Sequence, residues 1–135
     1  MAFLGRFDHQ LDDKKRVAIP ARYRDQFDKP AYLTASPDGC IAVYPKAAFD
    51  SAAAEVLEVS AKTPEGRGGR RQFFGLAADV PKDSQGRLLV PAPLLEHAQL
   101  KKDVVVIGAG EYFELWDRDV WVAATAGEAT SPGEE

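Results

Sequence analysis

The side chains best suited to bind a charged ligand lie in a short sequence pattern that occurs twice. The pattern is Asp-x-x-x-Arg-x-x-x-Pro, and its copies begin 71 residues apart, with Asp12 and Arg16 in the first and Asp83 and Arg87 in the second. A carboxylate at the start of a turn can accept backbone N–H bonds and pair with a nearby arginine, which orders the turn. An arginine can also bind a guanine edge or a phosphate. We favour the loop-ordering role for Asp12 and Asp83, whereas both roles stay open for the arginines.

Two lysines, Lys14 and Lys15, give the first turn a charge that the second turn lacks. The second turn has Gln85 and Gly86 at the corresponding positions. A motif that served only the fold would not need these lysines, which favours contact with DNA. A charged turn is also often simply solvated, so the sequence leaves both interpretations open.

Patterns typical of enzymes are absent from the sequence. The two histidines, His9 and His97, have no cysteine or carboxylate at metal-ligand spacing. The segment "GRGG" lacks the Lys-Ser/Thr of a phosphate-binding loop, and no serine lies in a nucleophile elbow. We therefore expect no enzyme activity, no metal, no cofactor and no small-molecule substrate.

The composition of the chain indicates where in the cell the protein is found and which kinds of partner it can bind. The 135 residues carry a net charge of −4, but seven acidic residues and one basic residue lie from Glu111 onward, so residues 1–110 carry +2. This distribution permits an anionic partner, provided that local geometry and several copies of the chain act together. No apolar run is long enough to span a membrane, and the N-terminus lacks a secretory signal. The single cysteine, Cys40, has no intramolecular partner. We expect a cytoplasmic protein that has no contact with a membrane.

The local patterns predict a mainly β protein with short helices, of the α+β class, built from two repeats. Alternating apolar runs and turn residues predict strands and hairpins, and Pro20 and Pro91 each start a short helix. The organisation we expect is repeat 1 at 3–47, a helical connector at 48–76, repeat 2 at 77–122 and a disordered tail at 123–135. Pro64 favours a second connector helix, which Gly66 and its neighbouring glycines disfavour. Each repeat is too small to be comfortable alone, so the halves should pack on each other or on another chain.

Several segments, in their order and spacing, resemble the MraZ family of bacterial transcriptional regulators. They are "FLG", "LDDKKRVAIPARYRD", "CIAVYP", "TPEGRGGRRQFFG", "DSQGRLLVPAPLLEHAQLKKDVVVIG" and "YFELWD", and together they cover roughly residues 3–122. The resemblance implies a pseudo-dimeric, swapped-hairpin β-barrel of the AbrB-like, double-ψ-like type, made from the two repeats and with helices between them. The sequence departs from the family at Lys15, where glycine is usual, and Ala2 lengthens the N-terminus by one residue.

The resemblance also implies a function and a set of contact residues. The family binds short direct repeats upstream of its own gene, at the head of the division and cell-wall gene cluster, as a ring of several subunits. By resemblance the first turn faces double-stranded DNA, so the expected contacts are Arg6, Lys14, Lys15, Arg16 and Arg87, in a nucleoid-associated protein. Alternatives are a protein-binding assembly adaptor that uses the same barrel, and a swapped-hairpin antitoxin.

Overall fold

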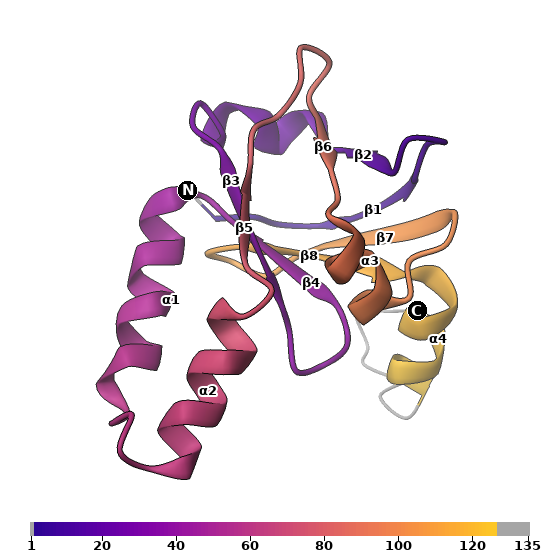
Figure 1. Cartoon of the computed structure of the whole chain (residues 1–135). Coiled ribbons are helices and arrows are strands. Elements are labelled where there is room, and N and C mark those ends of the chain that lie inside the picture. Colours follow the sequence, from indigo (N-terminus) through magenta and orange to yellow (C-terminus); the bar gives the residue numbers. More distant parts are fainter. Residues whose placement is uncertain (1, 127–135) are drawn as a thin grey trace.

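A computed structural model describes residues 2–126 and contains two copies of one β-rich unit (Figure 1). The elements of the first copy are β1 (Arg6–Gln10), β2 (Arg16–Ala18), the 3₁₀ helix η1 (Ala21–Gln26), β3 (Ala31–Ala35) and β4 (Ile41–Tyr44). The connector consists of α1 (Lys46–Glu58) and α2 (Pro64–Phe74). The elements of the second copy are β5 (Ala78–Val80), β6 (Arg87–Leu89), α3 (Ala92–Ala98), β7 (Asp103–Gly108) and β8 (Phe113–Asp117), and α4 (Arg118–Thr125) follows. The predicted α+β class, mainly β with short helices, is confirmed.

The two copies exchange strands. One antiparallel sheet has the order β1-β7-β8-β4-β3-β5, so the first strand of each copy pairs with the third strand of the other. The central pair, β4 with β8, also joins the copies. In Figure 1, β1, β7 and β8 cross the view while β3, β4 and β5 run up it, so the sheet is strongly twisted. Neither copy completes its own sheet, which agrees with the expectation that the halves need each other.

A second sheet, the two-stranded ribbon β2–β6, contains one strand from each copy. One further backbone hydrogen bond extends the strand pairing at each end of the ribbon. The N–H of Ile19 donates to the Gly86 carbonyl at 2.8 Å, and the N–H of Val90 donates to the Lys15 carbonyl at 2.9 Å. Because Ile19 and Val90 are equivalent residues, as are Lys15 and Gly86, the ribbon lies on the pseudo-twofold axis.

The core is filled from both copies. Four fully buried rings, Phe3, Tyr23, Phe27 and Phe113, pack with centroids 4.9 to 5.9 Å apart, and the Tyr23 hydroxyl donates to the Leu4 carbonyl at 2.6 Å. Rings at these separations add specific edge-to-face and offset contacts to the burial of apolar area. The first copy therefore holds its aromatic residues against the second copy's β8.

The connector helices rest on the sheet through aromatic stacking. On α1, Phe49 stacks on Tyr32 of β3 at 4.7 Å and on Phe73 of α2 at 5.3 Å. The Thr63 side chain caps α2 by accepting from the Gly66 N–H at 3.0 Å. The cap offsets the low helix propensity of the glycines, so α2 forms despite them.

The basic segment of α2 serves the connector itself. The Arg67 side chain donates to the Ala61 carbonyl at 3.1 Å, and Arg70 donates to the Val59 carbonyl at 3.1 Å. These carbonyls lie just beyond the end of α1, where backbone acceptors have no partner within the helix. Two of the arginines in "GRGGRR" therefore hold the helical hairpin together.

Helix α4 differs from the sequence analysis, which assigns residues 123–135 to a disordered tail. The helix runs through Thr125, and the rest of the expected tail, residues 127–135, lies outside the described residues. The buried Asp117 caps it, accepting from the N–H groups of Asp119 and Val120 and from the Lys101 ammonium at 3.1 Å. Trp121 packs α4 on Trp116, with ring centroids 5.3 Å apart. Within the described range, no helix has the length and apolar character needed to cross a membrane.

Gly66 gives a direct test of how the connector packs. A Cβ atom there would collide with the Ser60 carbonyl oxygen, so we expect Gly66→Ala to lower the free energy of unfolding by about 1–3 kcal/mol. Gly69→Ala is the matched control in the same helix, because a Cβ at Gly69 meets open space and should stabilise by about 0.5–1 kcal/mol. Urea unfolding followed by circular dichroism measures both. Equal stability of the two variants would contradict the close approach.

Candidate functional site

The first turn is organised around the carboxylate of Asp12. Its Oδ1 accepts the backbone N–H groups of Lys14 and Arg16, each at 2.9 Å, and its Oδ2 accepts Nε of Arg16 at 2.8 Å. One side chain thus satisfies two backbone donors and one guanidinium donor, which holds the turn in one shape.

The second turn repeats this geometry. Asp83 accepts the N–H groups of Gln85 and Arg87 at 2.9 Å, and Nε of Arg87 at 2.8 Å. The copies differ in side chains but not in backbone. Lys15 has φ of 65° and its counterpart Gly86 has φ of 76°, so both occupy the left-handed region. Lys15 therefore keeps the turn that Gly86 makes in the second copy, at a conformational cost of about 1–2 kcal/mol.

Hydrogen bonding sets the charge state of the two carboxylates. The backbone N–H of Arg16 lowers the pKa of Asp12, with further lowering by the Arg16 side chain and the Lys14 N–H and a partial opposing effect of desolvation. The pKa of Asp83 is lowered mainly by the backbone N–H of Arg87. Both groups are therefore anions at neutral pH, and each offsets part of the positive charge in its turn.

The ribbon β2–β6 places the two turns at its opposite ends. Arg16 pairs with Leu89 and Ala18 pairs with Arg87. The turns are therefore separated by about 14 Å, the length of four residues in a strand. Arg87 also reaches across the ribbon, with its Nη1 at 3.6 Å from Oδ2 of Asp12. The structure thus brings Lys14, Lys15, Arg16 and Arg87 onto one continuous surface.

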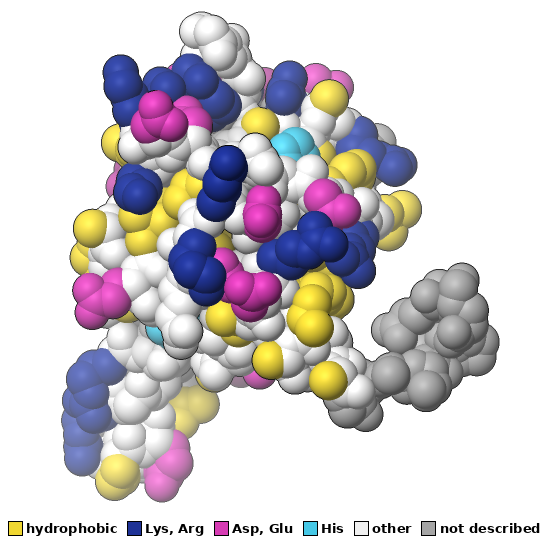
Figure 2. Space-filling model, turned by 90° about the vertical axis from the view of Figure 1, so that its right-hand side faces the viewer, with side chains coloured by type: hydrophobic (Ala, Val, Ile, Leu, Met, Phe, Trp, Pro, Cys, Tyr) yellow, Lys and Arg dark blue, Asp and Glu magenta, His cyan; other side chains and the backbone are white. Residues whose placement is uncertain are grey.

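The cations of this surface are presented in two ways. Lys14 and Lys15 are exposed, whereas the side chains of Arg16 and Arg87 are 29% and 27% exposed because each is drawn onto a carboxylate. Figure 2 views the molecule from the side on which the first turn projects, and it shows basic and acidic side chains intermixed. The cations of the turns therefore have carboxylates beside them on the same side of the molecule.

Arg24 belongs to the same surface, although the sequence analysis does not include it among the contact residues. Its Nε donates to the Ile19 carbonyl at 2.9 Å, and its side chain covers Gly86 of the second turn. Burial lowers the pKa of nearby His9, and the charge of Arg24 lowers it further. The signal in the sequence was the pair of arginines just after the first motif, but only the fold shows that one of them reaches the second turn.

Arg6 is not brought to this surface. It lies at the far end of β1 from the first turn, about 20 Å along the strand. Its guanidinium lies 5.9 Å from the ring centre of Trp121 on α4 and 3.8 Å from the Asp8 carboxylate. The expected DNA contact of Arg6 stays a prediction, although the extended strand β1 places this residue away from the first turn.

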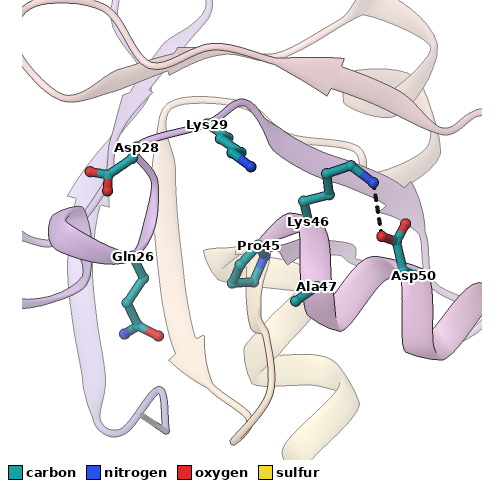
Figure 3. Close-up of a pocket in the computed structure, with 7 residues that line it drawn as sticks. All are labelled: Gln26, Asp28, Lys29, Pro45, Lys46, Ala47 and Asp50. Carbon is teal, nitrogen blue, oxygen red and sulfur yellow. Dashed lines mark hydrogen bonds and ion pairs between the residues drawn. The ribbon is translucent and has the colours of Figure 1, made fainter.

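A hollow lies beside the connector helix α1, and the single cysteine is buried. The hollow, of about 380 Å³, lies between the end of η1 and the start of α1. Its lining includes Lys46 and Asp50, whose ion pair is drawn in Figure 3 and measures 2.8 Å. Among residues 2–126, no group of three or more His, Cys, Asp or Glu side chains could hold a metal ion. The buried Cys40 has a pKa raised to about 12, chiefly by burial, so its thiol stays protonated and is a poor nucleophile.

Two β-rich units that exchange strands, each with the same Asp–Arg turn, define a two-repeat protein of the swapped-hairpin class. The chain belongs to the MraZ family. The family described as "MraZ protein, putative antitoxin-like" matches residues 2–72 and, a second time, residues 73–132. The double match agrees with the internal repeat and confirms the resemblance found in the motifs.

Curated relatives carry the name "Transcriptional regulator MraZ". One from Thermomicrobium roseum is 40% identical over 121 residues, which cover 90% of this chain and 85% of the relative. Relatives from Heliobacterium modesticaldum and Mycobacterium tuberculosis are each 40% identical over 119 residues, covering 88% of this chain and 83% of the relative. These relatives are named for regulation and not for catalysis, which agrees with the expectation that the chain is not an enzyme.

The strain at Lys15 can be measured by exchanging residues between the turns. We expect Lys15→Gly to raise the free energy of unfolding by up to about 1 kcal/mol, because relief of the left-handed lysine exceeds the added entropy of glycine. Gly86→Ala should be destabilising, because the new Cβ would lie 2.6 Å from Nε of Arg24 at a φ of 76°. Thermal unfolding of both variants tests this, and a destabilised Lys15→Gly would contradict it.

The lowered carboxylate pKa values predict acid sensitivity. An Asp whose folded pKa lies below its unfolded value of about 3.9 stabilises the fold fully above that value and loses the contribution as pH falls through the folded pKa. We expect Asp83→Asn to lower stability at neutral pH and to flatten its dependence on pH below about 4. Urea unfolding across pH measures this. Ser84→Ala, at the exposed position next to Asp83, removes no titratable group and is the control, which should keep the wild-type slope.

Proposed function

We propose that this chain is a transcriptional regulator that binds double-stranded DNA in a sequence-specific manner and needs no cofactor. The proposal includes the finer statements that the resemblance implies: a ring homo-oligomer, direct repeats upstream of the protein's own gene in the division and cell-wall cluster, and a cytoplasmic, nucleoid-associated location. The names of the curated relatives support regulation of transcription.

The observation that carries the proposal is the cationic first turn, held in shape by Asp12. Three consecutive cations, Lys14, Lys15 and Arg16, lie on a turn that has the same Asp–Arg hydrogen bonds as the partner turn, whose tip is neutral. The strained Lys15 is exposed, and none of the hydrogen bonds or ion pairs of residues 2–126 involves its ammonium group. A negatively charged ligand would pair with the Lys15 ammonium group and so offset the strain of its backbone.

The two kinds of cation suit two kinds of contact. The exposed lysines can neutralise phosphates, which sets affinity and its dependence on salt. Arg16 is held through Nε by Asp12, so its terminal nitrogens are the ones that would meet a guanine edge or a phosphate. A guanidinium fixed in place loses less entropy when it binds than a free one does.

Several copies of the turn would compensate for the acidic chain. One turn with three cations on a protein of net charge −4 binds DNA weakly by itself. A closed ring of identical subunits repeats the turn on one face, and each further contact then forms at a high effective concentration. Direct repeats in the DNA match this arrangement, because each repeat meets an equivalent turn.

Fluorescence anisotropy with two duplexes tests this proposal. We expect tight binding to the region upstream of the protein's own gene, weak binding to a shuffled duplex of equal composition, and a steep loss of affinity as salt rises. Equal binding to both duplexes would contradict sequence specificity. Binding to neither would contradict the proposal and favour the protein-binding adaptor.

Substitutions in the turn separate the two kinds of contact. Arg16→Ala should cost about 1–3 kcal/mol per site and relax sequence preference, whereas Lys14→Ala should weaken all duplexes evenly and reduce the salt slope by about 1. The matched control is Lys62→Ala, at an exposed lysine between α1 and α2. If Arg16→Ala bound both duplexes as the wild type does, the role assigned to Arg16 would be wrong.

A further inference from the structure

The β2–β6 ribbon has an apolar side chain among its cations. Leu89 is 56% exposed, although it lies directly opposite Arg16 in the ribbon. The adjacent Leu88 is fully buried in the core, as is Val17 in β2. Leu89 therefore takes no part in the core and faces outward with the arginines.

The outward face of the ribbon carries four side chains in a two-by-two arrangement. Arg16 and Leu89 form one pair, and Ala18 and Arg87 form the other. Because side chains alternate between the faces of a strand, these four share one face. The pseudo-twofold axis makes the arginines equivalent and makes Leu89 the counterpart of Ala18. The large apolar side chain is thus at the end of the ribbon that also carries Lys14 and Lys15.

A ligand for this end must combine negative charge with an exposed apolar group. Duplex DNA has both, because the C5-methyl group of thymine lies in the major groove between the phosphate backbones. The major groove is about 12 Å wide and admits a two-stranded β-ribbon, whose strands lie about 4.8 Å apart. The turn that would meet the phosphates and the side chain that would meet the methyl group are adjacent on the same face.

Resting on the proposed DNA-binding function, we propose that the β2–β6 ribbon enters the major groove and that Leu89 contacts the C5-methyl group of a thymine. The contact makes Leu89 a specificity residue beside Arg16. The small Ala18 leaves room at the other end of the ribbon, so the two repeats read the duplex unequally. The other strongly exposed apolar side chains lie elsewhere, such as Leu57 on α1 and Val122 on α4.

The test removes the methyl group from the DNA and the side chain from the protein. The probe is a duplex that the full-length protein selects from a random library, prepared with each thymine in turn replaced by deoxyuridine. For the wild type we expect one replacement to weaken binding about fourfold, the effect of one buried methyl group. For Leu89→Ala the affinity for the intact duplex should fall by at least as much, and the same replacement should then have no effect. The exposed Leu57→Ala is the matched control and should behave as the wild type.

The outcomes distinguish this inference from the proposed function. If the wild type selects a sequence but no deoxyuridine weakens binding, or if the loss is the same in Leu89→Ala, the thymine contact is overturned while DNA binding stands. If Leu89→Ala changes the mass of the oligomer, Leu89 is a subunit contact and the inference fails. If no sequence is selected, the proposed function fails and takes the thymine contact with it.

Discussion

The pairing of β2 with β6 is the interaction on which the rest of the molecule depends. The carbonyl groups of Lys15 and Gly86, at the ends of the two turns, accept the N–H groups of Val90 and Ile19 from the opposite repeat. Each turn is therefore completed by the other half of the chain. The same pairing buries Val17 and Leu88 and keeps both arginines on one surface. A substitution that opened the ribbon would have two effects at once: it would expose the core, and it would separate Arg16 from Arg87.

A symmetric backbone carries an asymmetric surface. The Asp–Arg bonds of the two turns agree to within 0.1 Å or less, so the hydrogen bonds constrain the backbone equally in both copies. Side chains outside these bonds differ between the copies: the exposed Lys15 corresponds to Gly86, which Arg24 covers, and the exposed Leu89 corresponds to Ala18. The ribbon takes one strand from each repeat, so neither repeat forms it alone. Its two ends differ in their surface side chains, because Lys15 and Leu89 lie at the same end.

Local sequence patterns predict most of the strands, turns and helices. They do not predict which strands and side chains of the two repeats contact each other. Strands, turns and the two helices that follow Pro20 and Pro91 depend on nearby residues, so the repeated motif predicted them. The sequence does not predict helix α4 because its last residues, Ala123 to Thr125, are small and lead into an acidic segment, although Asp117 is a recognisable N-cap. The adjacent Leu88 and Leu89 show the limit at the site. Alternation alone does not tell which of two neighbouring leucines faces the core, and the position of Arg24 against the second turn depends on a contact between repeats.

The exchange of strands also affects how the chain must be made. Arg6 in β1 pairs with Ile107 in β7, so the first strand waits for almost the whole chain before it has a partner. Such non-local pairing slows folding. A nascent chain that ends before β5 and β7 leaves β1 and the outer edge of β3 unpaired, and unpaired edges associate with other strands. Two chains growing on one messenger RNA therefore expose complementary edges at the same time, and each chain closes its own edges only after β5 and β7 are made.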